Sequence, residues 1–455
     1  MIRRLLHLEL NKYDTVVDAL NNLKAQGYHH SFKVRDNEAV CLETKEKIKA
    51  QDMEIVEFHR FEGDTDPGDM AIIYVVECEN GINGCIVDAY GMYSDGALNA
   101  FLNQVSIAEK KKQGIDVISF GIGDPDIPTP KFVLDSMFKH SNNPANHRYP
   151  ESEGLPIYRE AVSKYMKKRF NVELDPETEI ISLIGAKEGI GHASLALIDE
   201  GDISLVPDPG YPVYSAGCNF SGGQIYKMPL KESLGWKPDL NDIPESVAKK
   251  SKILWINYPN NPTGGIADLG FFKDVVDFGI ENDIAIMHDA CYAEVTFDDY
   301  IAPSILEVDR AMEIAIEYHS FSKSFNMTGW RLGFAAGNKE LVQNLLTVKS
   351  NLDSGVPQAI QMMGVEAFEK IEEFTNLNNE IYKKRRDKLA SALSEIGLNV
   401  VVPKAALYLW CKVPEGYNSA SFTELLLEQC NVVVTPGNGY GEYGEGYVRL
   451  SLTTP

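Results

Sequence analysis

Lys323 is the residue of this chain whose surroundings most clearly indicate chemistry. It lies in the segment 319–331, H-S-F-S-K-S-F-N-M-T-G-W-R, among hydroxyl side chains and shortly before Arg331. A lysine amine condenses with a carbonyl group to a Schiff base once its environment favours the neutral form, while Ser320, Ser322 and Arg331 could hold a phosphate by charge-assisted hydrogen bonds. The segment therefore indicates a site for an aldehyde that carries a phosphate. The spacing from Ser320 to Lys323 also fits the S-x-x-K signature of serine acyl-enzymes, and a lysine beside serines is often a solvated loop residue.

Two short apolar runs upstream of this segment, residues 253–256 and 284–287, have the length and composition of buried strands. Residues 267–282 between them have the apolar spacing of an amphipathic helix. A strand, a helix and a second strand in this order predict a right-handed parallel crossover. Both strands should therefore end at the same edge of a sheet.

Polar side chains follow each of these runs. Asn261 lies in the Y-P-N-N-P-T-G stretch after the first run, and Asp289 and Tyr292 follow the second. Open α/β sheets bind ligands at the carboxyl ends of their strands, so these side chains should meet at such a site. Taken singly, an Asn-Pro turn and an Asp that caps a helix would explain the same residues.

Three other segments carry candidate binding residues. Gly185 separates an apolar run from a helical one, and a helix N-terminus offers free N–H groups to an anion, although a generic glycine turn has the same pattern. Arg449 lies in the strand-like segment 446–451 and could grip a carboxylate. The segment 121–126, G-I-G-D-P-D, suggests a dinucleotide loop, but Asp126 replaces the third glycine, so a Rossmann site is disfavoured.

Taken together and in this order, the motifs resemble those of the class I aminotransferases, which are pyridoxal-phosphate enzymes of fold type I, from about residue 97 to the end of the chain. The resemblance implies an α/β fold with a mostly parallel central sheet and a smaller α/β domain. It implies that Lys323 forms the Schiff base with pyridoxal 5'-phosphate and carries the proton between the substrate α-carbon and the cofactor. Asp289 would pair with the pyridine nitrogen, and Asn261 and Tyr292 would donate to the ring's phenolic oxygen.

The same resemblance assigns the remaining contacts. The residues expected at the cofactor phosphate are Ala186 through its backbone amide, Lys187, Ser320, Ser322 and Arg331. Tyr211 is expected to stack on the pyridine face. Arg449 would hold the substrate α-carboxylate with two parallel hydrogen bonds, and Gly123 would let the backbone approach that carboxylate. Tyr149 and Asn351 would reach the active site of a neighbouring subunit, which implies a homodimer with shared active sites.

Two stretches resemble the LL-diaminopimelate aminotransferase subfamily: residues 349–355, K-S-N-L-D-S-G, and residues 435–444, T-P-G-N-G-Y-G-E-Y-G. This resemblance implies transfer of nitrogen from glutamate to tetrahydrodipicolinate, which makes LL-diaminopimelate for lysine synthesis. However, no tyrosine lies in register with the family's aromatic arm at residues 97–101. Aspartate, alanine and aromatic aminotransferases therefore stay open as alternatives, since few contacts decide which amino acid is accepted.

Two alternatives come from other classes of protein. A serine acyl-enzyme also needs S-D-N and K-T-G motifs, but the nearest match is Ser94-Asp95-Gly96 and the sequence contains no K-T-G. A regulatory relative that binds the cofactor without turnover would not need both Lys323 as proton carrier and Arg449 as carboxylate clamp. Both alternatives are disfavoured.

The composition excludes several classes of partner. The 455 residues are 44% hydrophobic and give a formal net charge of -23, so the chain can form a large core, and nucleic acid or an anionic membrane is not an expected partner. The seven cysteines form no C-x-x-C pair, so neither a metal site nor a disulfide framework is expected. These features, with no apolar run of membrane-spanning length, predict a soluble protein of the reducing cytoplasm.

We expect four regions along the chain. Residues 1–93 should form a separate small α+β domain of unknown role, with a helix at 13–26 and five short strands of an antiparallel sheet, at 30–34, 39–42, 53–59, 71–77 and 84–89. An acidic loop is expected at 61–69 and the junction at 90–96. Residues 94–150 should form the N-terminal arm and part of the small domain, 151–348 the large cofactor domain, and 349–455 the rest of the small domain. Relatives continue further beyond the residue equivalent to Arg449, so a C-terminal truncation is expected.

Overall fold

The computed structural model of the chain describes residues 13, 15–35, 37–61, 71–89, 96–398 and 400–455. Its contacts divide the chain into two compact units. The N-terminal unit comprises residues 1–119 and 420–433, and the main unit comprises residues 120–419 and 434–455. The four regions expected from the sequence stay predictions. Among the described residues, no helix is long and apolar enough to cross a membrane.

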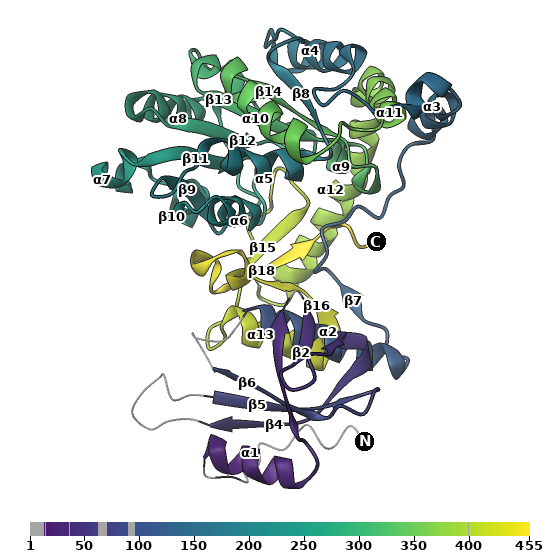
Figure 1. Cartoon of the computed structure of the whole chain (residues 1–455), viewed down its shortest axis with the longest axis vertical. Helices are drawn as coiled ribbons and strands as arrows, with labels where there is room; N and C mark the ends of the chain where they lie inside the picture. The colour runs from purple at the N-terminus through teal and green to yellow at the C-terminus, as the bar shows by residue number, and fades with distance from the viewer. Residues whose placement is uncertain (1–12, 14, 36, 62–70, 90–95, 399) are drawn as a thin grey trace. The chain divides into compact units, whose positions relative to one another are not determined.

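The N-terminal unit contains a six-stranded sheet in the order β3-β2-β1-β6-β5-β4 (Figure 1). Its strands are β1 (His30–Arg35), β2 (Glu38–Cys41), β3 (Lys47–Ile48), β4 (Met53–Phe61), β5 (Ala71–Cys78) and β6 (Gly84–Ala89). The five predicted strands are confirmed, and the pairing is antiparallel except between β1 and β6, which are parallel. Residues 62–69 of the expected loop and 90–95 of the expected junction lie outside the described residues.

Two helices bury their apolar sides in this unit. Leu23 of α1 (Val16–Ala25) packs in one cluster with Ile73 and Val75 of β5, while Phe101 of α2 (Gly96–Lys112) belongs to another with Val76. Since consecutive strand residues point to opposite faces, the two helices cover opposite faces of the sheet. The unit also contains β7 (Ile118–Ser119), which pairs in parallel with β16 (Val432–Val433), and most of α13 (Ser419–Cys430).

The main unit is built on a seven-stranded sheet in the order β10-β9-β11-β12-β13-β14-β8. The strands are β8 (Ile180–Leu183), β9 (Ile203–Asp208), β10 (Gln224–Pro229), β11 (Ser251–Asn257), β12 (Ala285–Asp289), β13 (Ala315–Ser320) and β14 (Gly333–Gly337). All pairs are parallel except those of β14, which is antiparallel to both neighbours. The predicted mostly parallel sheet is confirmed. The predicted strand, helix and strand are β11, α8 (Leu269–Asn282) and β12.

Helices cover both faces of this sheet. Trp255 packs in one hydrophobic cluster, whereas its neighbours Leu254 and Ile256 pack in another, as the alternation of side chains along a strand requires. A sheet covered on both faces explains why its strands are continuous apolar runs. The other helices of the unit are α3 (Lys131–Ser141), α4 (Pro156–Phe170), α5 (Ala186–Leu197), α6 (Val213–Phe220), α7 (Glu245–Ala248), α9 (Phe321–Ser324), α10 (Lys339–Leu352), α11 (Gln358–Glu369) and α12 (Ile371–Glu395).

A smaller sheet in the same unit carries the expected substrate arginine. It is antiparallel, in the order β15 (Tyr408–Lys412), β18 (Tyr447–Ser451) and β17 (Thr435–Pro436). Arg449 lies in the middle of β18 and pairs with Trp410 of β15. The predicted strand at 446–451 is therefore confirmed.

Candidate active site

Three neighbouring parallel strands bring the predicted residues to one edge of the large sheet. Asn257 at the end of β11 is in register with Asp289 at the end of β12, which is in register with Tyr318 of β13. β13 continues to Ser320, and the short helix α9 that follows contains Lys323. The sheet thus brings Asn257, Asp289 and the lysine-bearing helix to the same edge. The sequence predicted this edge for Asn261 and Asp289 as the ligand-binding edge of an α/β sheet.

Asp289 is held from three sides. Its side chain is buried, Oδ2 accepts a hydrogen bond from the hydroxyl of Tyr214 at 2.7 Å, and Oδ1 accepts one from the backbone N–H of Cys291 at 3.2 Å. Its backbone carbonyl oxygen accepts a hydrogen bond from Asn257 Nδ2 at 2.8 Å. Burial and the adjacent carboxylate raise the pKa of Tyr214, so the phenol keeps its proton and remains a donor. These contacts fix the carboxylate in one orientation.

Lys323 lies beside the loop that precedes α3. Its Nζ donates to the carbonyl oxygen of Gly123 at 2.5 Å. The Oγ of Ser320 accepts a hydrogen bond from the backbone N–H of Ser322 and so caps the N-terminus of the helix that contains Lys323. A Cβ at Gly123 would lie 2.3 Å from the hydroxyl of Tyr408, so only glycine allows this close approach.

An anion cradle forms where α5, β13 and β14 meet. A Cβ on Gly185, the N-cap of α5, would lie 2.2 Å from Nη2 of Arg331. A Cβ on Gly333 would lie 2.9 Å from the backbone nitrogen of Ala186, and Gly333 is in register with Ser320. A guanidinium, a helix N-terminus and a serine therefore converge. This donor set fits a phosphate group.

The predicted partners Ser322 and Lys187 differ in their exposure. Ser322 is buried within α9, whereas Lys187, the second residue of α5, is exposed. Their roles at the phosphate stay predictions.

Arg449 carries a buried charge close to Asn261. Its Nη1 donates to Asn261 Oδ1 and its Nη2 to the carbonyl oxygen of Gly121, each at 2.9 Å. The guanidinium also lies over the rings of Tyr408 at 4.1 Å and Tyr440 at 4.9 Å. Among the hydrogen bonds and ion pairs of the described residues, no carboxylate pairs with this cation, and its Nε has no hydrogen-bond partner. A buried charge paired only with neutral groups favours an anionic ligand.

Tyr292 is linked to the same group through a second phenol. Its hydroxyl lies 2.8 Å from the hydroxyl of Tyr408, whose ring underlies Arg449. Burial, followed by the neighbouring Tyr408, raises the pKa of Tyr292 well above its usual range. Tyr292 therefore stays protonated and can donate a hydrogen bond.

The other predicted aromatic residues differ in their surroundings. Tyr211 is half-buried, its ring meets that of Tyr214 edge-on at 5.9 Å, and burial together with Asp289 raises its pKa to about 12. Tyr149 is 90% exposed. Asn351 is also exposed and donates to the Thr347 carbonyl within its own helix α10. The expected roles of Tyr149 and Asn351 in a partner subunit stay predictions.

Tyr214 and Tyr408 are the candidate site residues that the sequence interpretation missed. Tyr214 lies within the short helix α6 and Tyr408 in an ordinary apolar strand, so neither has a motif of its own. Tyr214 is separated from Asp289 by 75 residues and Tyr408 from Tyr292 by 116. Only the folded chain brings these pairs together.

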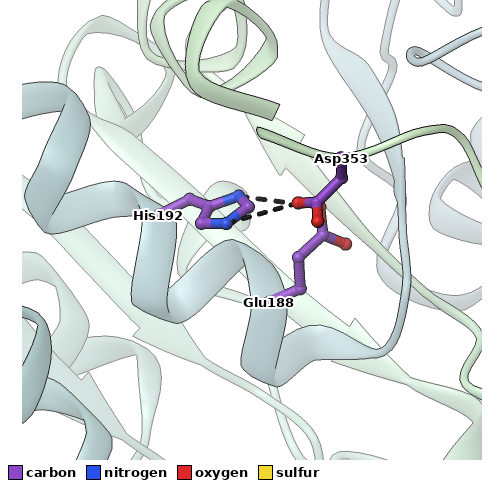
Figure 2. A group of neighbouring side chains, drawn as sticks. All are labelled: Glu188, His192 and Asp353. Carbon is purple, nitrogen blue, oxygen red and sulfur yellow. Dashed lines mark ion pairs between the residues drawn. The ribbon is translucent and has the colours of Figure 1, made fainter. Parts of the chain in front are cut away.

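An ion-pair network adjoins the cradle on α5 (Figure 2). His192 Nδ1 lies 3.6 Å from Glu188 Oε1, and His192 Nε2 lies 3.3 Å from Asp353 Oδ2. These three side chains are close enough together to offer ligands to a metal ion. However, the buried ammonium of Lys349 lies 2.7 Å from Glu188 Oε1 and repels a second cation there. We interpret the group as a network that ties the end of α10 to α5.

A cavity of about 760 Å³ lies elsewhere in the main unit. Trp236, Pro403, Trp410 and Tyr447 are among its lining residues, and the predicted site residues do not line it. A large cavity is a common sign of a ligand site. The buried charges and hydrogen-bonding groups of the candidate site lie instead at the strand ends and around Arg449.

Comparison with known proteins identifies the family. Residues 115–455 match the family model described as aminotransferase class I and II. The chain is 54% identical over 349 residues to an LL-diaminopimelate aminotransferase of Dehalococcoides mccartyi, covering 77% of this chain and 90% of the relative. It is 50% identical over 347 residues to the enzyme of the same name from Moorella thermoacetica, covering 76% of this chain and 89% of the relative.

Solved structures agree with this result. The structure of substrate-bound BacF from Bacillus subtilis matches with a TM-score of 0.74 and 36% identity, over 76% of this chain and 88% of that one. A probable N-succinyldiaminopimelate aminotransferase from Thermus thermophilus matches with a TM-score of 0.75 and 33% identity, over 78% of this chain and 96% of that one. The predicted fold type I architecture is therefore confirmed. The chain belongs to the class I and II aminotransferases and is a pyridoxal-phosphate-dependent enzyme.

Proposed function

We propose that this aminotransferase exchanges an amino group between LL-diaminopimelate and 2-oxoglutarate, in lysine biosynthesis. Relatives of that name are 50–54% identical to this chain over about 90% of their own length. The observation that carries the assignment of a site is that Lys323 and Arg449 both donate to the segment 121–123, through Gly123 and Gly121. Arg449 also donates to Asn261, in the turn after β11, and Asp289, held by Tyr214, ends the neighbouring strand β12.

Each of these groups has a role in the proposed reaction. When bound, pyridoxal phosphate supplies a ring that accepts electrons from the α-carbon of the amino acid. Asp289 keeps a proton at the position of the ring nitrogen, and Tyr292 donates a hydrogen bond to an anionic oxygen. Arg449 binds the α-carboxylate and so orients the α-carbon toward Lys323. Lys323 Nζ would take the α-proton and deliver it to the cofactor instead of back to the α-carbon, as transfer of the amino group requires.

The phosphate end anchors the cofactor. We assign the Ala186 amide, Ser320 and Arg331 to the phosphate, because these donors converge at Gly185 and Gly333. Tyr211 would cover the ring face, since its ring contacts that of Tyr214 and it is close enough to Asp289 for this carboxylate to help raise its pKa.

A half-reaction screen tests the substrate. Amino donors are added singly to the protein loaded with pyridoxal phosphate, and loss of the cofactor's absorbance is followed, with Lys323→Ala as the inactive control. LL-diaminopimelate and glutamate should react at least ~10-fold faster than aspartate, alanine or phenylalanine. A site that hydrogen-bonds the far end of its substrate rejects amino acids whose side chain cannot make those bonds. Faster conversion by one of the other three would assign the chain to that specificity, and no conversion by any donor would indicate a non-catalytic relative.

We also propose a homodimer in which each active site takes Tyr149 and Asn351 from the neighbour. The exposure of both side chains supports this proposal. Mixing inactive Lys323→Ala protein with weakened Tyr149→Phe protein, after subunit exchange, should restore activity, because one site of the hybrid then holds both native residues. No recovery in a proven hybrid would place both residues in the same subunit's site.

The proposed location is the cytoplasm. All seven cysteines are unpaired thiols, and five of them are buried, which suits a reducing compartment. Fractionation of the source cells with an antibody to this chain tests the location, and recovery outside the cytoplasm would refute it.

A further inference from the structure

A buried polar cluster lies behind the active-site edge of the sheet. His288 and Glu317 are neighbours in register on β12 and β13, and both are fully buried. The Glu317 carboxylate accepts hydrogen bonds from His288 Nδ1 at 2.8 Å, His319 Nε2 at 2.6 Å, the backbone of Ile305 at 2.9 Å and the Ser304 hydroxyl at 3.0 Å. The Ile305 N–H is a fixed donor, and the Ser304 hydroxyl and the two histidine nitrogens lie within donating distance, so the surroundings suit an ionised Glu317.

The contacts of His288 determine its protonation. Its Nδ1 faces the Glu317 carboxylate, and its Nε2 faces the carbonyl oxygen of Tyr258 at 3.0 Å. A neutral imidazole has one donor and one acceptor nitrogen, so it would set a lone pair against one of these oxygens. The imidazolium satisfies both contacts and neutralises the carboxylate. Burial opposes ionisation of Glu317, but the hydrogen bonds from His288 and His319 outweigh it and lower the pKa of this carboxyl.

The cluster touches all three strands that carry the active site. Tyr258, whose carbonyl binds His288, directly follows β11 and begins the turn that holds Asn261, where the Asn261 N–H donates to Asn257 at 2.9 Å. His288 directly precedes Asp289 on β12. His319, which binds Glu317, directly precedes Ser320 on β13.

We propose that His288 and Glu317 form an imidazolium–carboxylate pair that acts as a positioning element, tying together the carboxyl ends of β11, β12 and β13 so that Asn261, Asp289 and Ser320 are correctly spaced. The inference rests on the proposed cofactor site. A buried ion pair often adds no more stability than well-packed apolar residues, because both charges lose their hydration. Its directional hydrogen bonds, however, specify the spacing of three strand ends.

Nuclear magnetic resonance of ¹⁵N-histidine-labelled protein tests the charge state directly. His288, assigned by the loss of its signals in His288→Gln, should show both ring nitrogens protonated at pH 7, because both face oxygen acceptors. A His288 with one unprotonated nitrogen at pH 7 would overturn the proposal. This measurement needs only the wild-type fold and one variant.

Cofactor affinity tests the positioning role. Glu317→Gln and His288→Gln are titrated with pyridoxal phosphate well below their unfolding temperatures. The matched control is Asp298→Asn, which removes a carboxylate that pairs with Lys383 and with the buried Arg386 and does not belong to the cluster. We expect the dissociation constant to rise at least ~10-fold in both cluster variants and to change less than ~2-fold in the control.

Three outcomes separate the claims. If the cluster variants lower the unfolding temperature but bind the cofactor as wild type does, the pair is only structural and the inference fails. If the wild type binds no pyridoxal phosphate, the proposed function fails instead. If one cluster variant does not fold, cofactor titration of the other variant still decides the question.

Discussion

The two large sheets of this protein differ in what they bury. The seven-stranded sheet buries Asn257, Asp289 and Glu317 at or near the carboxyl ends of adjacent strands. In the described part of the six-stranded sheet, His59 is the single buried residue with a polar side chain other than cysteine. Apolar residues of α1 and α2 pack against its two faces. Burying a polar group costs folding free energy unless the group is hydrogen-bonded. A cluster of buried polar groups at neighbouring strand ends therefore indicates a functional site. We therefore assign the chemistry to the main unit.

The largest effect that this comparison predicts is at Lys323. Replacing it with alanine removes the proton carrier and should lower the rate of transamination by roughly 10²–10⁴-fold or more, with little loss of stability. Steady-state assays with glutamate and 2-oxo acids measure the change. Lys339→Ala, at the exposed start of α10, is the matched control and should keep its rate. A Lys323→Ala protein with near-native turnover would refute the assigned chemistry.

A core substitution in the N-terminal unit should change stability without changing chemistry. Phe101 is fully buried among the residues between α2 and the six-stranded sheet, so Phe101→Ala should cost about 3–5 kcal/mol of unfolding free energy for that unit. Urea unfolding and kcat are measured on the same sample, with Phe220→Ala, 83% exposed, as the control. A large fall in kcat while the main unit stays folded would show that the N-terminal unit shapes the active site.

Loss of the buried guanidinium should affect the substrate more than the cofactor. Arg449→Ala removes a charged donor worth about 1.5–3 kcal/mol, so KM for the amino acid should rise roughly 10- to 150-fold while affinity for pyridoxal phosphate changes little. Arg310→Ala, which breaks only a surface pair with Glu313, is the control. Equal losses of substrate and cofactor affinity would count against a carboxylate clamp.

The smallest expected effect concerns the residue that orients Asp289. Tyr214→Phe deletes the 2.7 Å hydrogen bond but keeps the ring stacked on Trp255, so cofactor binding should weaken by about 1–2 kcal/mol. Tyr226→Phe removes an exposed hydroxyl bonded to the Asp242 carbonyl and should leave cofactor binding unchanged. Identical dissociation constants for the two variants would show that Asp289 needs no help from Tyr214.

Much of the fold could be predicted because the buried parallel strands are continuous apolar runs. The runs before Asn261 and Asp289 predicted β11 and β12 and their end at one edge of the sheet, whereas the family resemblance implied that Lys323 lies near Asp289. The parallel pairing of β1 with β6 was not predicted, since pairing depends on contacts distant in sequence.

The supporting residues of the site could not be predicted for the same reason. Tyr214 and Tyr408 act through contacts across the folded chain. Glu317 and His288 lie in strands whose polar residues have no spacing that reveals a buried pair. Local pattern thus indicated the candidate ligand-binding residues, and three-dimensional packing revealed the residues that contact them.

Reduction with borohydride followed by peptide mapping identifies the lysine that binds the cofactor aldehyde. Protein incubated with pyridoxal phosphate is treated with borohydride, digested, and searched for the lysine that carries the cofactor. We expect about one cofactor per chain on Lys323, and none on that peptide in Lys323→Ala. Attachment mainly to another lysine such as Lys187 or Lys349, or no attachment at all, would contradict it.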